Sequence, residues 1–98
     1  MKDPRIDVLA HNLINYSLKL KKGEKVLIEN FGLQRDLVKA LVRETYKVEA
    51  YPFVSLKDHQ VNRELLLGAE QEQYDMMATF EANVMKEMDA YIGLRSGD

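Results

Sequence analysis

The two polar residues of this chain that are best placed for chemistry are Asp58 and His59. They follow directly after segment 51–56, whose apolar composition is typical of a β-strand. In an open sheet of parallel strands, ligands bind at the carboxyl ends of the strands, so this pair could take a ligand or a catalytic role. An aspartate at that place also caps a helix and leaves the neighbouring histidine exposed. We favour the capping interpretation and leave the roles of both residues open.

A metal site within the chain is not predicted. The sequence contains no cysteine, so it has neither a thiolate ligand nor a disulfide framework. Its two histidines, His11 and His59, lie far apart, and neither has a partner at the spacing of metal ligands. We therefore assign no catalytic, cofactor-binding or metal-binding residue.

The segment from Glu29 to Gly32 follows the first predicted strand, where a nucleotide-binding fold places its phosphate turn. It holds one glycine rather than the pattern G-x-G-x-x-G. A receiver-type phospho-acceptor site would need an acidic pair here, and Glu29 is a single carboxylate. Phosphate binding at Gly32 or Asp58 is kept as a minor alternative.

The elements that must position these residues can be predicted from hydrophobic spacing. Asp3 is expected to cap a helix that begins at Pro4 and runs to about Leu20, with Gly23 as its left-handed terminal residue. The unbroken apolar centre of segment 25–29 predicts a strand buried on both faces. The remaining predicted elements are helix 33–46, strand 51–56 with Pro52 at its start or on an edge, helix 58–68, helix 70–88 and strand 90–95.

One helix, predicted over 70–88, carries most of the methionines of the chain. We expect its apolar stripe to face inward; the stripe consists of Tyr74, Met77, Phe80, Val84 and Met88. Met76, Met77, Met85 and Met88 could form an adaptable binding surface. We favour their packing against the sheet.

The order of the predicted elements is α-β-α-β-α-α-β, which indicates an α/β fold. Helices between successive strands force parallel pairing with right-handed crossovers, so we expect a three-stranded parallel sheet with helices on both faces. This arrangement is half of a doubly wound domain, and the alternative is a small complete three-layer domain. Exposed sheet edges predict self-association, and we expect a homodimer.

Composition excludes several classes of protein. The chain has 98 residues and a formal net charge of -2, whereas nucleic-acid-binding proteins usually carry a clear excess of basic residues. Residues 1–49 carry an excess of basic residues and residues 50–98 an excess of acidic ones. No apolar run is long enough to cross a membrane, and no signal-peptide core is visible, so we expect a cytoplasmic protein.

Particular segments of the chain resemble the thermophilic-type bacterial aminopeptidases, a family of dinuclear metallo-exopeptidases. The likeness covers nearly the whole chain and follows the order of the family. It rests on residues 3–7 (DPRID), 13–18 (LINYSL), 22–28 (KGEKVLI), 37–44 (LVKALVRE), 50–54 (AYPFV) and 88–95 (MDAYIGLR). Glu49 departs from the pattern, because a glycine is expected before the second strand.

This resemblance implies an enzyme that removes amino-terminal residues from peptides with two divalent metal ions of the zinc or cobalt type. In that family the metal ligands are glutamate, histidine and aspartate residues in a later part of the chain, so none is carried over here. We therefore expect residues 1–98 to be a single α/β domain, the N-terminal fragment of a longer chain, inactive alone. The alternative is a stand-alone α/β binding or dimerisation module.

Overall fold

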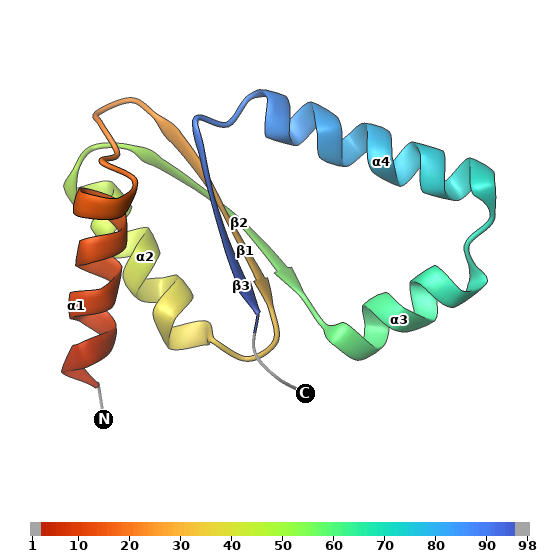
Figure 1. Cartoon of the computed structure of the whole chain (residues 1–98), viewed down its shortest axis with the longest axis horizontal. Helices are drawn as coiled ribbons and strands as arrows, with labels where there is room; N and C mark the ends of the chain where they lie inside the picture. The colour runs from red at the N-terminus through yellow and green to blue at the C-terminus, as the bar shows by residue number, and fades with distance from the viewer. Residues whose placement is uncertain (1–2, 96–98) are drawn as a thin grey trace.

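The computed structural model describes residues 3–95 and contains one three-stranded sheet. Its strands are β1 (Lys25–Phe31), β2 (Tyr51–Lys57) and β3 (Ala90–Arg95), all parallel, in the order β2-β1-β3 (Figure 1). The predicted α/β class and parallel sheet are confirmed. The chain end at Asp98 lies outside the described residues.

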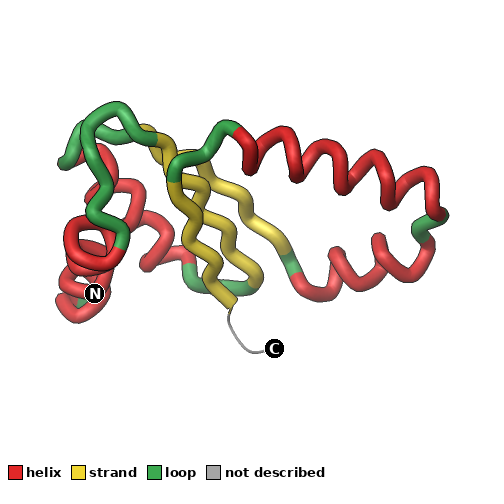
Figure 2. Tube along the Cα trace, turned by 45° about the horizontal axis from the view of Figure 1, so that its top comes forward, coloured by secondary structure: helices red, strands yellow, loops and turns green. Residues whose placement is uncertain are grey.

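The helices lie on opposite sides of this sheet. On one side are α1 (Pro4–Asn12), the π-helical turn η1 (Leu13–Ser17) and α2 (Arg35–Lys47). On the other side are α3 (His59–Gly68) and α4 (Gln71–Lys86) (Figures 1 and 2). We call these two helices and the residues that join them the arm. The crossover from β1 to β2 and that from β2 to β3 run in opposite directions across the sheet. Right-handed crossovers therefore place their helices on opposite faces.

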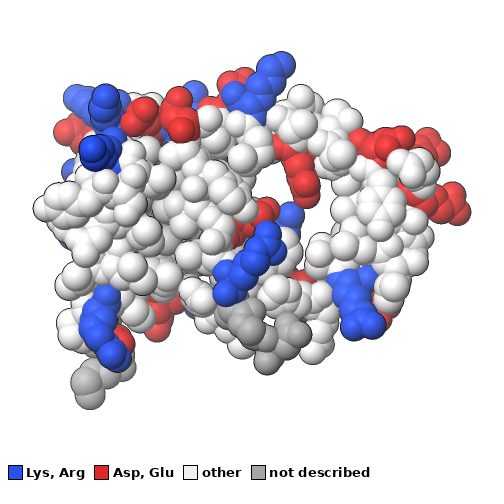
Figure 3. All heavy atoms as spheres, viewed as in Figure 1, with Lys and Arg blue, Asp and Glu red and all other residues white. Residues whose placement is uncertain are grey.

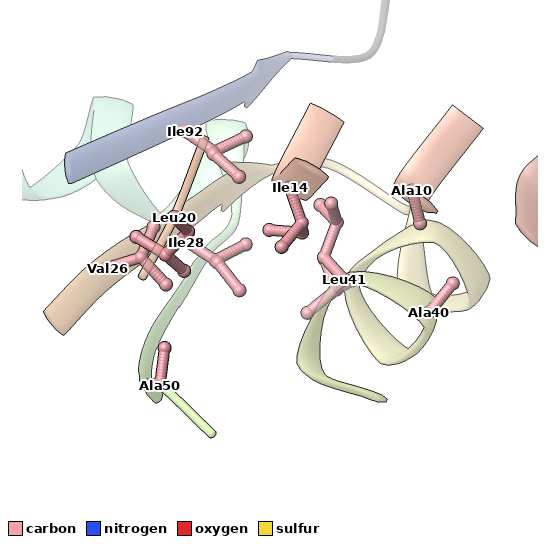
Figure 4. Close-up of a cluster of buried hydrophobic side chains, with 10 residues drawn as sticks. Ala10, Ile14, Leu20, Val26, Ile28, Ala40, Leu41, Ala50 and Ile92 are labelled. Atoms are coloured by element: carbon pink, nitrogen blue, oxygen red, sulfur yellow. The ribbon is translucent and has the colours of Figure 1, made fainter. Parts of the chain in front are cut away.

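The hydrophobic core lies between the sheet and the α1–α2 side. Val26 and Ile28 of β1 are fully buried, as are Ile14 of η1 and Leu41 of α2 (Figure 4). Ile92 of β3 completes the contact from the neighbouring strand. Leu27, on the other face of β1, is also buried, which confirms the prediction that this strand is buried on both faces.

The arm corrects two sequence predictions. None of the residues of α3 and α4 is buried, and Phe80 is 68% exposed. The expectation that Tyr74, Met77, Phe80, Val84 and Met88 face a core is therefore wrong. So is the packing of the methionines on the sheet, since Met76 and Met85 are 58% and 42% exposed. The spacing predicts the helix, but the sheet lies too far away to cover its apolar stripe.

The end of the first helical segment also differs from the prediction. It stops at Ser17 rather than near Leu20, and Lys19 takes the left-handed conformation with φ 51°. Gly23, with φ 83°, lies in the turn before β1 and does not end the helix. The amide of Leu18 donates to the carbonyl of Leu13, a spacing of five residues that defines the π turn.

Pro52 lies near the start of β2, an outer strand of the described sheet, as predicted. The amide of Tyr51 donates to the Glu24 carbonyl at 2.8 Å, and the carbonyl of Lys57 accepts from the Gly32 amide at 3.2 Å. Main-chain groups alternate along a strand, so those of Pro52 point away from β1. Its missing N–H therefore leaves no gap in the ladder.

Glu49 occupies the position where the sequence comparison led us to expect glycine. Glu49 has a left-handed φ of 61° and follows α2 in a Schellman-type turn. The amide of Glu49 donates to the Tyr46 carbonyl, and that of Ala50 donates to the Thr45 carbonyl. A residue with a Cβ is strained in this conformation.

We expect Glu49→Gly to raise the free energy of unfolding by about 0.5–1 kcal/mol, because glycine adopts this conformation without strain. The measurement is urea denaturation of the variant beside the unchanged chain. Glu49→Ala is the matched control, since it also removes the exposed ion pair with Lys22 at 3.3 Å but keeps the strain. Equal stability of the glycine and alanine variants would contradict the explanation.

Candidate functional site

The candidate site is a hollow of about 1000 Å³ between the open face of the sheet and the arm. Figure 3 shows the opening between these two parts of the molecule. Strand alternation directs Leu27, Glu29, Phe53 and Tyr91 to this face, opposite to the core. The arm contributes apolar side chains, among them Leu65, Met77, Phe80 and Val84.

Polar groups that line the hollow form one network, which we call the Glu29 cluster: Glu29, Lys57, Glu81 and Tyr91. The hydroxyl of Tyr91 donates to Oε1 of Glu29 at 2.7 Å, and Nζ of Lys57 lies 3.1 Å from Oε2. The same ammonium lies 3.3 Å from Oε1 of Glu81 on α4. Lys57 therefore joins the arm to the sheet, although Glu81 is 64% exposed and its contact with Lys57 is weak.

Gly93 makes the contact between Tyr91 and Glu29 possible. Gly93 is the register partner of Glu29, and the Tyr91 ring lies across it. A Cβ at position 93 would meet the Tyr91 hydroxyl oxygen at 2.9 Å, which real side chains essentially never do. A glycine inside a strand often marks such a close approach, so Gly93 is the signal in the sequence that could have pointed to this contact, although the sequence analysis did not use it.

The cluster keeps Glu29 ionised. Burial alone would raise the pKa of Glu29, but the Tyr91 hydroxyl and the cations of Lys57 and Arg95 outweigh it, so the pKa lies below the usual 4.5. Burial would lower the pKa of Lys57, and its two carboxylate partners reverse this and raise it. The hydrogen bond to Glu29 is the main cause that raises the pKa of Tyr91.

The last residues of the three strands form a row at the carboxyl edge of the sheet. Phe31 is the register partner of Lys57 on one side and Arg95 on the other. The Arg95 guanidinium lies 4.6 Å from the centre of the Phe31 ring, and Nζ of Lys57 lies 5.3 Å from it. The His59 ring lies 5.6 Å from the same ring. The Phe31 ring therefore contacts Lys57, which belongs to the cluster, and brings the cation of Arg95 beside it.

Asp58 acts as the cap that the sequence favoured. Its Oδ1 accepts from the amides of Gln60 and Val61 at 2.9 and 3.0 Å, which fixes the start of α3. Asp58 also lines the hollow, whereas the His59 ring packs near Phe31.

Asn30, the residue before the end of β1, lies on the core face of the sheet and does not line the hollow. Asn30 is buried on the same face as Val26 and Ile28, and its Nδ2 donates to the Gly32 carbonyl at 3.2 Å. Its Oδ1 has no hydrogen-bond partner among the described residues. Gln34 before α2 makes no side-chain cap.

A second polar network, which sequence reasoning missed, joins α1 to α2. Glu44 has an exposed side-chain fraction of only 8%, with Nδ1 of His11 at 2.9 Å and Nζ of Lys47 at 2.7 Å. The Lys47 hydrogen bond is the main reason that the pKa of Glu44 lies below its usual value. This network lies away from the hollow and ties two helices together.

The residues that the structure describes do not fit a metal centre. Within residues 3–95 no group of three or more histidine, aspartate and glutamate side chains could hold a metal ion. The two carboxylates that converge, Glu29 and Glu81, already share the ammonium of Lys57. Within the same range, no helix has the length and apolar character to span a bilayer.

Comparison with known proteins gives a family and a solved structure. Residues 2–98 match the family model described as thermophilic metalloprotease (M29). The solved structure of wild-type AmpT from Thermus thermophilus superposes with a TM-score of 0.72 at 25% sequence identity. The match covers 97% of this chain and 25% of AmpT, so the chain spans about a quarter of the length of that protein. No curated protein matches the chain.

We expect Glu29→Gln to lower the free energy of unfolding by about 1–2 kcal/mol at neutral pH, because it removes a charge-assisted contact with Lys57. Folding lowers the pKa of Glu29, so its ionised form stabilises the folded chain at pH values above the usual pKa of 4.5. This stabilisation is lost as the pH falls through the lowered pKa. Urea denaturation at several pH values should therefore show the two proteins converging in acid.

The matched control is Glu81→Gln, which removes the exposed partner of the same lysine. Its expected cost is below about 0.5 kcal/mol. A larger cost for Glu81→Gln than for Glu29→Gln would contradict the assignment of Glu29 as the centre of the cluster.

Proposed function

Because this chain belongs to the M29 family of thermophilic metalloproteases, we propose that it is the N-terminal α/β part of a metal-dependent aminopeptidase. The parent enzyme would hydrolyse amino-terminal residues from peptides with two divalent ions of the zinc or cobalt type. The observation that carries the proposal is the match to one quarter of AmpT over nearly all of this chain. The catalytic metal ions would then lie in the remaining part of the parent enzyme.

The hollow supports this assignment. Its walls contain large exposed apolar side chains, with Phe80 at 68% and Val61 at 67% exposure. Apolar patches of this kind mark surfaces that are covered in the working protein. The remaining part of the parent polypeptide would cover them, and the family's metal ligands would stand on that part.

The role of residues 1–98 in the parent enzyme would be structural. Lys57 of the Glu29 cluster makes a weak contact with Glu81 on the arm, and no group in residues 3–95 supplies a metal site. Metal ions in such enzymes lower the pKa of a bound water and polarise the scissile carbonyl. This chain would shape the wall of the site and leave that chemistry to the other part. We also propose a cytoplasmic location.

A stand-alone interaction module is the second candidate, and the exposed apolar residues of the arm favour it as well. The two candidates differ in the reading frame downstream of codon 98. An open frame that encodes glutamate, histidine and aspartate motifs supports the enzyme, and a stop codon supports the module.

We expect the 98-residue chain to show no hydrolysis of an aminoacyl anilide in the presence of cobalt or zinc. AmpT from Thermus thermophilus serves as the positive control under the same conditions. The measurement is anilide release with and without a chelator. Turnover that rises with chain concentration and disappears with the chelator would place a complete metal site within this chain and refute the proposal.

A further inference from the structure

One side of α4 lies outside the hollow and carries exposed apolar side chains. The helix runs along the outer boundary of the molecule (Figure 1), and every one of its residues except Met77 is exposed. Met76 and Phe80 expose 58% and 68% of their surface. With four polar residues of the same helix they line a groove of about 510 Å³, which we call the outer groove; the four are Glu72, Asp75, Thr79 and Asn83.

The spacing of these residues makes the outer groove a surface of one helix face. They recur at steps of three and four positions along α4, so they share one side of the helix. From Glu72 to Asn83 the groove runs about 16 Å, or about three turns. The hollow is lined by a different side of α4, which includes Met77 and Val84, and Phe80 lies at the boundary. A helix face of this length is a surface on which a second helix can pack.

The charge of this part of the chain selects the partner. Residues 70–89 contain six acidic residues and one basic residue, which is a net charge of -5. Glu70, Glu72 and Asp75 stand where α4 begins, and Figure 3 shows acidic side chains gathered at that end of the arm. The same segment holds four of the five methionines, whose flexible side chains adapt to irregular apolar partners. This surface therefore repels nucleic acid and anionic lipid and attracts a basic, apolar partner.

We propose that the outer groove binds a basic amphipathic helix of another protein, packed antiparallel to α4. The apolar side chains of the partner would contact Met76 and Phe80, and its cations would lie beside Glu72 and Asp75. Cations are favoured in the C-terminal turns of their own helix. Antiparallel packing brings those turns to the acidic end of α4. The hollow is not used, so the proposal stands independently of where the catalytic metal ions lie.

The test uses a labelled synthetic peptide of about 18 residues, long enough to form a helix on binding. Its leucines follow the spacing i, i+3, i+4, i+7, and its lysines lie in the C-terminal half. Fluorescence anisotropy with the 98-residue chain should show saturable binding that weakens as salt is added. A second peptide keeps the leucines and moves the lysines to the N-terminal half, and it should bind more weakly. Absence of binding by the first peptide, or tighter binding by the second, would overturn the proposal.

Substitutions locate the peptide on the chain. We expect Met76→Ala to weaken binding about tenfold, because its side chain lies near the centre of the groove. Val8→Ala, at a position of α1 that is 60% exposed, is the matched control and should leave the affinity unchanged. We expect Glu72→Gln to weaken binding about two- to fivefold at low salt, as loss of an exposed ion pair does. Glu64→Gln on α3 is its control.

Leu65→Ala separates the outer groove from the hollow, since Leu65 lines only the hollow. This variant should bind the peptide like the unchanged chain, and circular dichroism should show that all variants keep their helices. Loss of binding in Leu65→Ala with full binding in Met76→Ala would place the peptide in the hollow and refute the proposal. Sedimentation of the chain alone that shows association dependent on Met76 would assign the groove to a second copy and refute it as well.

Discussion

Burial of one face of β1 against Ile14 and Leu41 is the contact on which the remaining structure depends. Val26 and Ile28 fill this contact, and strand alternation then directs Leu27 and Glu29 to the opposite side. The hydrophobic effect therefore places a carboxylate on the floor of the hollow, although it acts on the other face of the strand. The Glu29 cluster follows from this placement, because Lys57 and Tyr91 come from the strands on either side.

The elements that follow from local physics could be predicted from the sequence. The apolar run in 25–29 predicts a strand buried on both faces, Pro52 predicts a strand start or an edge, and Asp58 predicts the start of a helix; all three are confirmed. The left-handed conformation of Glu49 also agrees with the glycine that the family pattern led us to expect. In each case the cause lies within a few residues of the effect.

The features that were not predicted depend on contacts between distant segments. Tyr91 and Glu29 are 62 positions apart, and His11 and Glu44 are 33 apart. No periodicity along the chain shows that such groups will meet. The prediction that the apolar stripe of α4 faces a core is wrong for a related reason. Spacing predicts which side chains share a helix face, but only tertiary structure decides whether another surface covers that face.

The arm is attached to the sheet at both of its ends. α3 begins directly after Asp58, at the carboxyl edge of the sheet, and three residues separate α4 from β3, which starts at the amino edge. A segment held at two opposite edges cannot swing outward like a flap on a single hinge. Its freedom is limited to tilting about the line that joins its two attachments. Any molecule that fills the hollow must therefore enter from the side, past the arm, or be in place before the sheet is complete.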